Sequence, residues 1–187
     1  MNYYNMNIDN LYFYINQKVL LRDDCDKICQ AIDINQENDF LTFLNNGSNN
    51  GSNNELKTVI VSAIQNTFDK YLTYNKENNL GDQLYNLEKF PITKIHAIKM
   101  LQNDYNNKYN SLIKNEMHNN LDQTITIIMV LNCENVITVN GEEHIIAAGD
   151  IAIFPNIWSY LYTEKINNAN NTNNYVYLLK IYTDEII

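Results

Sequence analysis

The order of the sequence patterns predicts an α+β fold in which N-terminal helices cover one face of a sandwich-like or barrel-like β half. Apolar residues recur with a helical period up to about residue 74, and from Ile92 onward they follow short, extended, β-branched segments. The 187 residues suffice for one domain with its own hydrophobic core. We therefore predict a single domain over residues 1–187, with a strand and helices over 1–90 and the β half over 91–187.

The N-terminal part is expected to hold a strand and at least two helices. Residues 11–21 alternate as a strand would, and Asp23 or Asp24 is expected to cap the helix that follows. The tract 45–54, NNGSNNGSNN, has nothing to bury and predicts a flexible surface loop. The clearest helix runs from Glu55 to about Tyr74, because its apolar residues form one stripe: Leu56, Val59, Ile60, Ala63, Ile64, Phe68, Tyr71 and Leu72.

The β half reads as seven or eight short strands separated by turn residues. Asn140-Gly141 stands between two β-branched segments, and this dipeptide favours a two-residue type I′ hairpin turn. Gly149-Asp150 marks the next reversal. The run from Thr124 to Leu131 is apolar on both faces of an extended strand, which predicts a central strand covered by helices on one side and by an opposing sheet on the other.

Composition narrows the classes of partner and the location. Lys plus Arg total 13 and Asp plus Glu total 22, giving a net charge of −9, and Arg22 is the only arginine, so we expect no nucleic-acid partner. The longest apolar run, Ile127–Leu131, is far too short to span a membrane, and no membrane partner is expected. The N-terminus lacks the basic and apolar regions of a signal peptide, which predicts a cytoplasmic, intracellular location.

The chain holds about 35 asparagines, a usage typical of AT-rich coding sequences such as those of some protists and large DNA viruses. A viral origin would place the protein in the virion or the infected host cell. The odd number of cysteines, Cys25, Cys29 and Cys133, without a second Cys or His pair at ligand spacing predicts reduced core thiols, not a disulfide or zinc site.

Four segments, in order and spacing, resemble the prolyl 4-hydroxylase-like branch of the iron- and 2-oxoglutarate-dependent oxygenases. They are VLLRDDCDKICQAI, TITIIMVLN, VITVNGEEHIIAAGDIAIFPN and YVYLLKIY, and together they extend the resemblance from Val19 to the last strand. The resemblance implies a double-stranded β-helix core, of the jelly-roll or cupin-like kind, buttressed by the N-terminal helices.

The same resemblance implies that the iron ligands of that family are missing. The family holds Fe(II) with a His-x-Asp motif and a distal His. In that family a Tyr-x-x segment precedes the His-x-Asp motif. When Tyr105 is aligned with the tyrosine of this segment, Lys108 and Asn110 stand where the His and Asp of the motif belong. A shifted alignment would instead use His118. Ser159 and Tyr160 stand near the place of the distal His, and no histidine follows His144.

The 2-oxoglutarate site is also incomplete by this comparison. Asn174 stands where an Arg or Lys should open the last strand, and Lys165 or Lys180 would have to substitute from another geometry. No cofactor is therefore expected. A residual metal trio of His118, Asp122 and His144 remains conceivable if their strands face each other. His96 is expected to be a half-buried structural histidine.

The main functional hypothesis is a non-catalytic, oxygenase-like protein that binds a protein partner, self-associates or serves as a structural module, such as a viral decoy. It is motivated by 14 tyrosines and one tryptophan, which give rigid contact area with a polar tip. The expected pocket or interface residues are Tyr105, Trp158, Tyr160, Tyr162 and Lys180. Two alternatives stay open: an active Fe(II) and 2-oxoglutarate-dependent hydroxylase with atypical ligands, and a cupin-like binder of a small molecule or sugar.

Overall fold

The structure is a computed structural model that describes residues 13–35, 37, 39–46, 51–78, 92–109, 123–139, 142–155, 162–169 and 174–184. The helices are α1 (Arg22–Ile34), α2 (Phe40–Asn46), α3 (Gly51–Glu77) and a short helix over residues 102–109. The strands are β1 (Tyr14–Asn16), β2 (Ile92–Leu101), β3 (Gln123–Val130), β4 (Cys133–Val139), β5 (Glu142–Ile146), β6 (Ile151–Pro155), β7 (Tyr162–Ala169) and β8 (Tyr175–Asp184).

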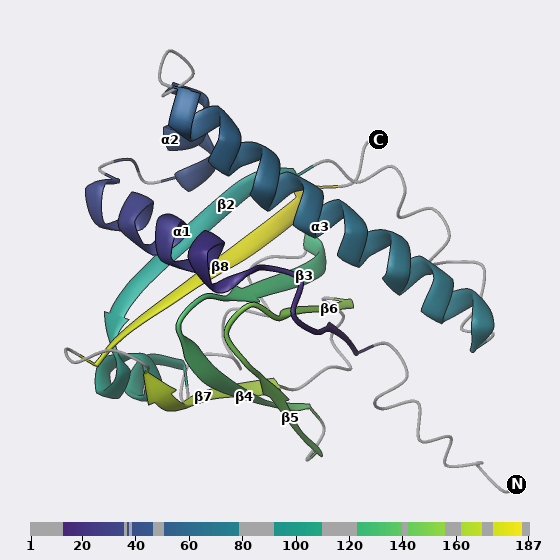
Figure 1. Ribbon diagram of the computed structural model, residues 1–187. Helices are drawn as coiled ribbons and strands as arrows, with labels where there is room; N and C mark the ends of the chain where they lie inside the picture. The colour runs from purple at the N-terminus through teal and green to yellow at the C-terminus, as the bar shows by residue number, and fades with distance from the viewer. Residues whose placement is uncertain are drawn as a thin grey trace, which may run out of the picture.

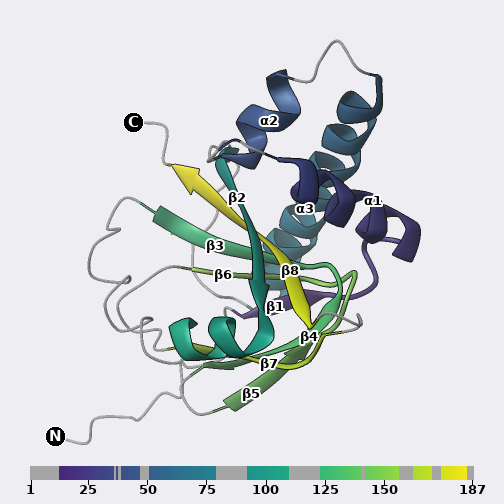
Figure 2. The ribbon, with the colours of Figure 1, turned by 90° about the vertical axis from the view of Figure 1, so that its left-hand side faces the viewer.

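The described strands form two antiparallel sheets. Sheet A has the order β1-β6-β3-β8-β2, and sheet B has the order β5-β4-β7. Helices α1, α2 and α3 lie on one side of sheet A, and sheet B lies on its other side (Figures 1 and 2). The α+β class, with helices first and strands after, is confirmed. Among the described residues, no helix combines the length and the apolar character that crossing a bilayer would require.

Sheet A separates two hydrophobic cores. The outer core lies between the sheet and the helices, and the inner core lies between the two sheets. Strand β3 contributes Ile127 and Met129 to the outer core and Ile128 and Val130 to the inner core, because successive side chains of a strand point to opposite faces. The prediction that the segment 124–131 is a central strand covered on both faces is therefore confirmed.

The N-terminal elements differ from their predicted bounds. Strand β1 has three residues, where the alternating pattern extends over 11–21. Leu21 is the N-cap of α1 and makes no side-chain capping bond, so the expectation that Asp23 or Asp24 caps the helix was wrong. Both aspartates lie in the first turn instead, where carboxylates interact favourably with the positive end of the helix dipole.

The Asn/Gly/Ser tract is more helical than expected. Helix α2 extends to Asn46 and α3 already begins at Gly51, so the loop prediction was wrong for residues 45–46 and 51–54, and residues 47–50 lie outside the described part of the chain. Once the apolar stripe of α3 is packed, extending the helix by one turn costs little even for polar residues of modest helix propensity.

Turn chemistry in the β half follows the sequence closely. Gly149 has φ of +90°, a region that favours glycine, and Asp150 accepts hydrogen bonds from the backbone N–H groups of Lys18 (2.8 Å) and Ala147 (3.0 Å). The reversal predicted at Gly149-Asp150 is thus confirmed. Strands β4 and β5 pair in antiparallel fashion, as the predicted hairpin requires, while its turn residues Asn140 and Gly141 lie outside the described residues.

Candidate functional site

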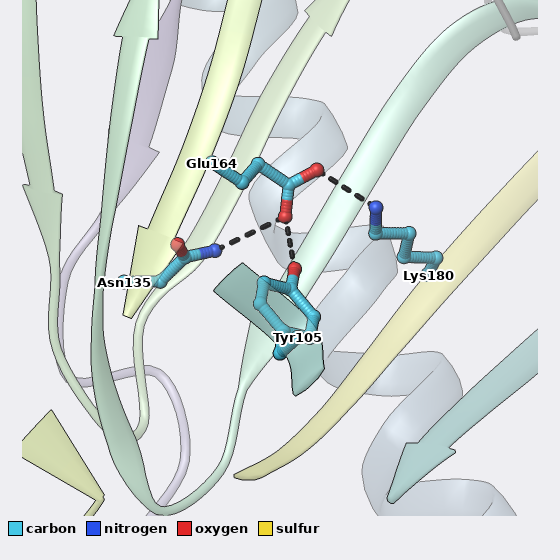
Figure 3. Close-up of polar contacts among 4 residues, drawn as sticks. All are labelled: Tyr105, Asn135, Glu164 and Lys180. Carbon is cyan, nitrogen blue, oxygen red and sulfur yellow. Dashed lines mark hydrogen bonds and ion pairs between the residues drawn. The ribbon is translucent and has the colours of Figure 1, made fainter. Parts of the chain in front are cut away.

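Four polar side chains meet in the space between the two sheets (Figure 3). Tyr105 comes from the helix over 102–109, Asn135 from β4, Glu164 from β7 and Lys180 from β8. Glu164, Asn135 and Tyr105 have no exposed surface, and Lys180 is 5% exposed. We call these four residues the interior cluster.

Strand periodicity explains why two charged residues of opposite sign lie inside. On β7, Thr163 and Lys165 are exposed while Glu164 between them is buried. On β8, Leu179 and Ile181 belong to the outer core, so the intervening Lys180 points to the other face of sheet A, toward sheet B. The two side chains therefore approach each other from opposite sheets.

The Glu164 carboxylate is the centre of the interior cluster. Lys180 Nζ donates to Oε1 at 2.7 Å, and the Tyr105 hydroxyl donates to Oε2. Asn135 Nδ2 also donates to Oε2, at 3.3 Å. Three donors from three different elements thus converge on one carboxylate, as the dashed lines in Figure 3 show.

The Lys180 ammonium has a second favourable neighbour. Its Nζ lies 4.0 Å from the centroid of the Tyr109 ring, within the range of a cation–π interaction. Tyr109 is itself buried and packs against the Tyr105 ring, with 4.4 Å between ring centroids. The short helix over 102–109 therefore supplies both a hydroxyl to the anion and an aromatic face to the cation.

Burial accounts for the pairing of the two charges in the interior cluster and for the protonated state of Tyr105. Isolated charges are costly in an apolar interior, so a buried carboxylate and a buried ammonium are tolerated only as a hydrogen-bonded pair. Burial, together with the neighbouring Glu164 charge, raises the pKa of Tyr105 well above its usual value. Tyr105 consequently stays protonated near neutral pH and serves as a donor. One cation and one anion cancel, and the interior cluster carries no net charge.

The structure places some of the predicted site residues and leaves others untested. Tyr105 and Lys180, expected at a pocket or interface, lie together in the interior cluster. Lys108 is exposed near the end of the short helix, with its Nζ 5.3 Å from the Tyr109 ring centroid. Tyr162 begins β7, but its side chain is outside the described part of the chain. Also outside it are Asn110, His118, Asp122, Trp158, Ser159 and Tyr160.

The two described histidines stand on the end strands β2 of sheet A and β5 of sheet B. His144 is half-buried on β5 and stacked on Phe13, with 4.4 Å between ring centroids. Within the described part of the chain, its buried Nε2 has no hydrogen-bond partner. Burial lowers the pKa of His144, and the charge of Glu142 partly opposes this. His96 is half-buried on β2, in register with Lys180. The half-buried position predicted for His96 is confirmed.

Potential metal ligands do not gather in the described parts of the chain. In these parts, no group of three or more His, Cys, Asp or Glu residues is placed to hold a metal ion. Ile137 stands between His144 and Glu164 in the register of sheet B, so these two residues lie on different strands with β4 between them. The trio of His118, Asp122 and His144 stays a prediction, because two of its members are not described.

All three cysteines are free thiols. Burial raises the pKa of Cys25 to about 11 and that of Cys29 to about 12, and it also raises the pKa of Cys133. Thiols of such high pKa stay protonated at neutral pH and are poor nucleophiles and metal ligands.

Glu164 and Asn135 are the functional candidates that the sequence alone does not indicate. Glu164 stands in a polar run, Thr163-Glu164-Lys165, that reads as solvent-exposed, and Asn135 is one asparagine among many. The only sequence signal is the alternation on β7, which would place Glu164 on the same face as Ile166.

The chain matches no family model, and it matches no curated protein sequence. Among solved structures, it is similar to a prolyl-4-hydroxylase from Pseudomonas putida, with 10% sequence identity and a TM-score of 0.48. That similarity covers 92% of this chain and 84% of the hydroxylase chain.

Proposed function

We propose that this chain is an oxygenase-like protein without catalytic activity, which acts as a protein-binding or structural module. We also propose that sheets A and B are the two halves of a double-stranded β-helix. From β3 to β8 the chain passes through sheets A, B, B, A, B and A in turn, and such alternation between two facing sheets is typical of jelly-roll folds.

The observation that carries the proposal is that the chain itself neutralises its interior cation. The resemblance to oxygenases requires a basic side chain that grips the 2-oxoglutarate carboxylate. Lys180 points into the inter-sheet space, but its ammonium is already bound by Glu164 at 2.7 Å and faces the Tyr109 ring. An incoming carboxylate would have to displace Glu164.

That displacement is energetically unfavourable. Breaking a buried ion pair by taking away one partner costs about 3–5 kcal/mol, because the other charge is left uncompensated. Glu164 would lose its pairing with Lys180 while having no exposed surface through which water could solvate it. A cosubstrate would need to supply this energy in addition to its own desolvation.

The inner core around the cluster also favours a packing role. Phe13 stacks on Phe154 with 5.2 Å between ring centroids, and both side chains are buried between the sheets. Ile137 and Ile166 of sheet B have no exposed surface. These side chains fill part of the space between the two sheets.

Anaerobic titration of the full chain with Fe(II) and 2-oxoglutarate tests the proposal. We expect neither calorimetric heat of binding nor the metal-to-ligand charge-transfer absorption that the ternary complex gives, while a catalytically active oxygenase run in parallel gives both. Stoichiometric binding of both compounds would contradict the proposal and favour the catalytic alternative that depends on His118.

A further inference from the structure

A groove of about 880 Å³ runs along one side of α3, next to β1. Its walls include the Tyr14 ring of β1 and the Tyr74 ring of α3, whose centroids are 5.4 Å apart. The groove also has two exposed carboxylates from α3, Asp69 and Glu77. It lies on the helix side of sheet A and is separate from the interior cluster.

We propose that this groove binds an extended, basic segment of a partner protein, which adds a strand to the edge of sheet A at β1. The proposal rests on the protein-binding function proposed above and identifies the surface and the chemistry of the partner.

Among the described strands, β1 offers an open edge. It is the last strand in the order of sheet A and pairs with β6, through Tyr14 with Ile153 and Asn16 with Ile151. No other described strand pairs with its second side. Unpaired backbone groups on a sheet edge are a template for strand addition, and a helix alongside turns such an edge into a groove for an extended peptide.

A buried polar network holds β1 against α3. The Asn16 side chain is 4% exposed; its Nδ2 donates to Thr67 Oγ1 at 3.0 Å, and its Oδ1 accepts from Lys70 Nζ at 3.1 Å. The distance between strand and helix is therefore fixed before any partner binds. Such preorganisation lowers the entropic cost of binding.

The charges of the groove favour a basic partner. Lys70 also lines the groove, but its ammonium is hydrogen-bonded to Asn16, and Asp69 and Glu77 leave an acidic excess. The Asp69 carboxylate accepts a hydrogen bond from Gln65 Nε2 at 2.9 Å through Oδ1, and a carboxylate has lone pairs enough to accept more. The chain as a whole carries −9, so a basic segment would also be attracted at long range.

The spacing of the carboxylates predicts the spacing of the basic residues. Asp69 and Glu77 are eight residues apart, so the rise of α3 separates them by about 12 Å along its axis. An extended strand covers this length in about four residues, and residues i, i+2 and i+4 share one face. Around the helix the two carboxylates differ in direction by about 80°, which the long side chains of Lys or Arg can span. For a segment that follows the axis of α3, we therefore propose Lys or Arg at i and i+4, with an aromatic or aliphatic residue at i+2 facing Tyr14 and Tyr74.

Fluorescence anisotropy with a labelled nine-residue peptide tests this geometry. The peptide has lysines at positions 3 and 7, a tyrosine at position 5 and threonine or serine elsewhere, and it is titrated with the full chain at low salt. We expect saturable binding that weakens about tenfold in the variant Asp69→Lys/Glu77→Lys, since a tenfold change corresponds to about 1.4 kcal/mol for two exposed ion pairs. The variant Glu55→Lys, exposed on α3 outside the groove, should bind like the unaltered chain.

Two further peptides separate strand addition from simple charge attraction. A peptide with lysines at positions 3 and 6 places them on opposite faces and should bind more weakly, as should one with N-methyl groups on alternate amides. Absence of binding up to about 1 mM, equal affinity for both lysine spacings, or equal weakening by Glu55→Lys would overturn the proposal. Because Asp69 and Glu77 are exposed, circular dichroism of the variants should show an unchanged fold. The peptide measurements and the Fe(II) and 2-oxoglutarate titration are independent, so a peptide result that overturns the groove proposal would leave the titration result unchanged.

Discussion

At position 149, the backbone conformation and the close packing both require glycine. A Cβ at this position would lie 2.7 Å from the Leu20 carbonyl oxygen, and φ of +90° is a conformation that other residues rarely adopt. The carbonyl of Gly149 also accepts hydrogen bonds from the N–H groups of Val19 and Leu20, at 2.9 and 3.1 Å. The glycine thereby lets the turn before β6 contact the segment that leads into α1.

We expect Gly149→Ala to lower the free energy of unfolding by about 2 kcal/mol or more, since strain of this kind costs about 1–3 kcal/mol before the steric clash is added. Urea denaturation followed by circular dichroism measures the change. The neighbouring Ala148→Ser, at an exposed position of the same turn, is the matched control and should have little effect. A Gly149→Ala variant as stable as this control would show that the turn can move away from Leu20.

His144 should give the protein a dependence of stability on pH. Its pKa in the folded chain lies below the usual 6.5, so the unfolded chain binds the proton more readily as the pH falls. The stabilisation that the neutral ring provides is complete above pH 6.5 and is lost as the pH falls through the folded-state pKa.

Urea denaturation at pH 7.5 and at about pH 5 checks this sign. The variant His144→Phe keeps a ring against Phe13 but does not titrate, so it should lose less stability than the unaltered chain over the same interval. Carboxylates titrate in both proteins and cancel in the difference. An identical loss in both would mean that His144 is free to take up a proton in the folded state.

The short helix over 102–109 holds strand β7 in place through side-chain amides. Asn106 Oδ1 accepts from the Ile166 N–H at 2.7 Å, and Asn106 Nδ2 donates to the Ile166 carbonyl oxygen at 3.1 Å. Gln102 Nε2 donates to the same carbonyl oxygen at 3.0 Å. These amides satisfy backbone groups of β7 two residues from Glu164, and the same helix brings Tyr105 to the carboxylate.

Replacing Asn106 with alanine should cost about 1–3 kcal/mol, because it leaves the backbone groups of Ile166 without this partner in a part-buried site. Hydrogen exchange of the Ile166 amide should accelerate, as followed by NMR. Asn103→Ala, at an exposed position of the same helix, is the control. If Ile166 exchanges equally fast in both variants, the helix does not hold β7.

Most helices and strands were predictable because their sequence signals lie within one short segment. The features that the prediction missed depend on contacts between segments far apart in the sequence. The stripe of α3, the two-faced run of β3 and the Gly149-Asp150 turn each lie within one short segment. The cap of α1, the length of β1 and the residue at which α3 begins depend on packing between elements, which the periodicity of the sequence does not contain. Asn106 and Glu164 act through contacts 60 and 59 residues away in sequence, and a polar residue gives no local sign of such a partner.

For the molecule as a whole, sheet A is shared between two cores with different character. The outer core against the helices consists mainly of apolar side chains and accounts for the predicted buttressing. The inner core combines aromatic and aliphatic side chains with one buried ion pair, Lys180 with Glu164. The net charge of −9 can be read from the sequence. The acidic groove beside α3, in contrast, exists only in the folded chain, because it requires β1 to lie next to α3.

The central claim is that Glu164 and Lys180 satisfy each other inside the folded protein, and a double-mutant cycle on global unfolding tests it most directly. Glu164→Gln and Lys180→Met are measured singly and together by urea denaturation at pH 7, with the exposed Lys165→Met of β7 as the control. The account predicts that Lys180→Met costs about 3–5 kcal/mol and that the double variant costs much less than the sum of the single ones. Additive effects, or a Lys180→Met variant no less stable than the Lys165→Met control, would mean that the pair is open to solvent and that the interior is accessible to ligands after all.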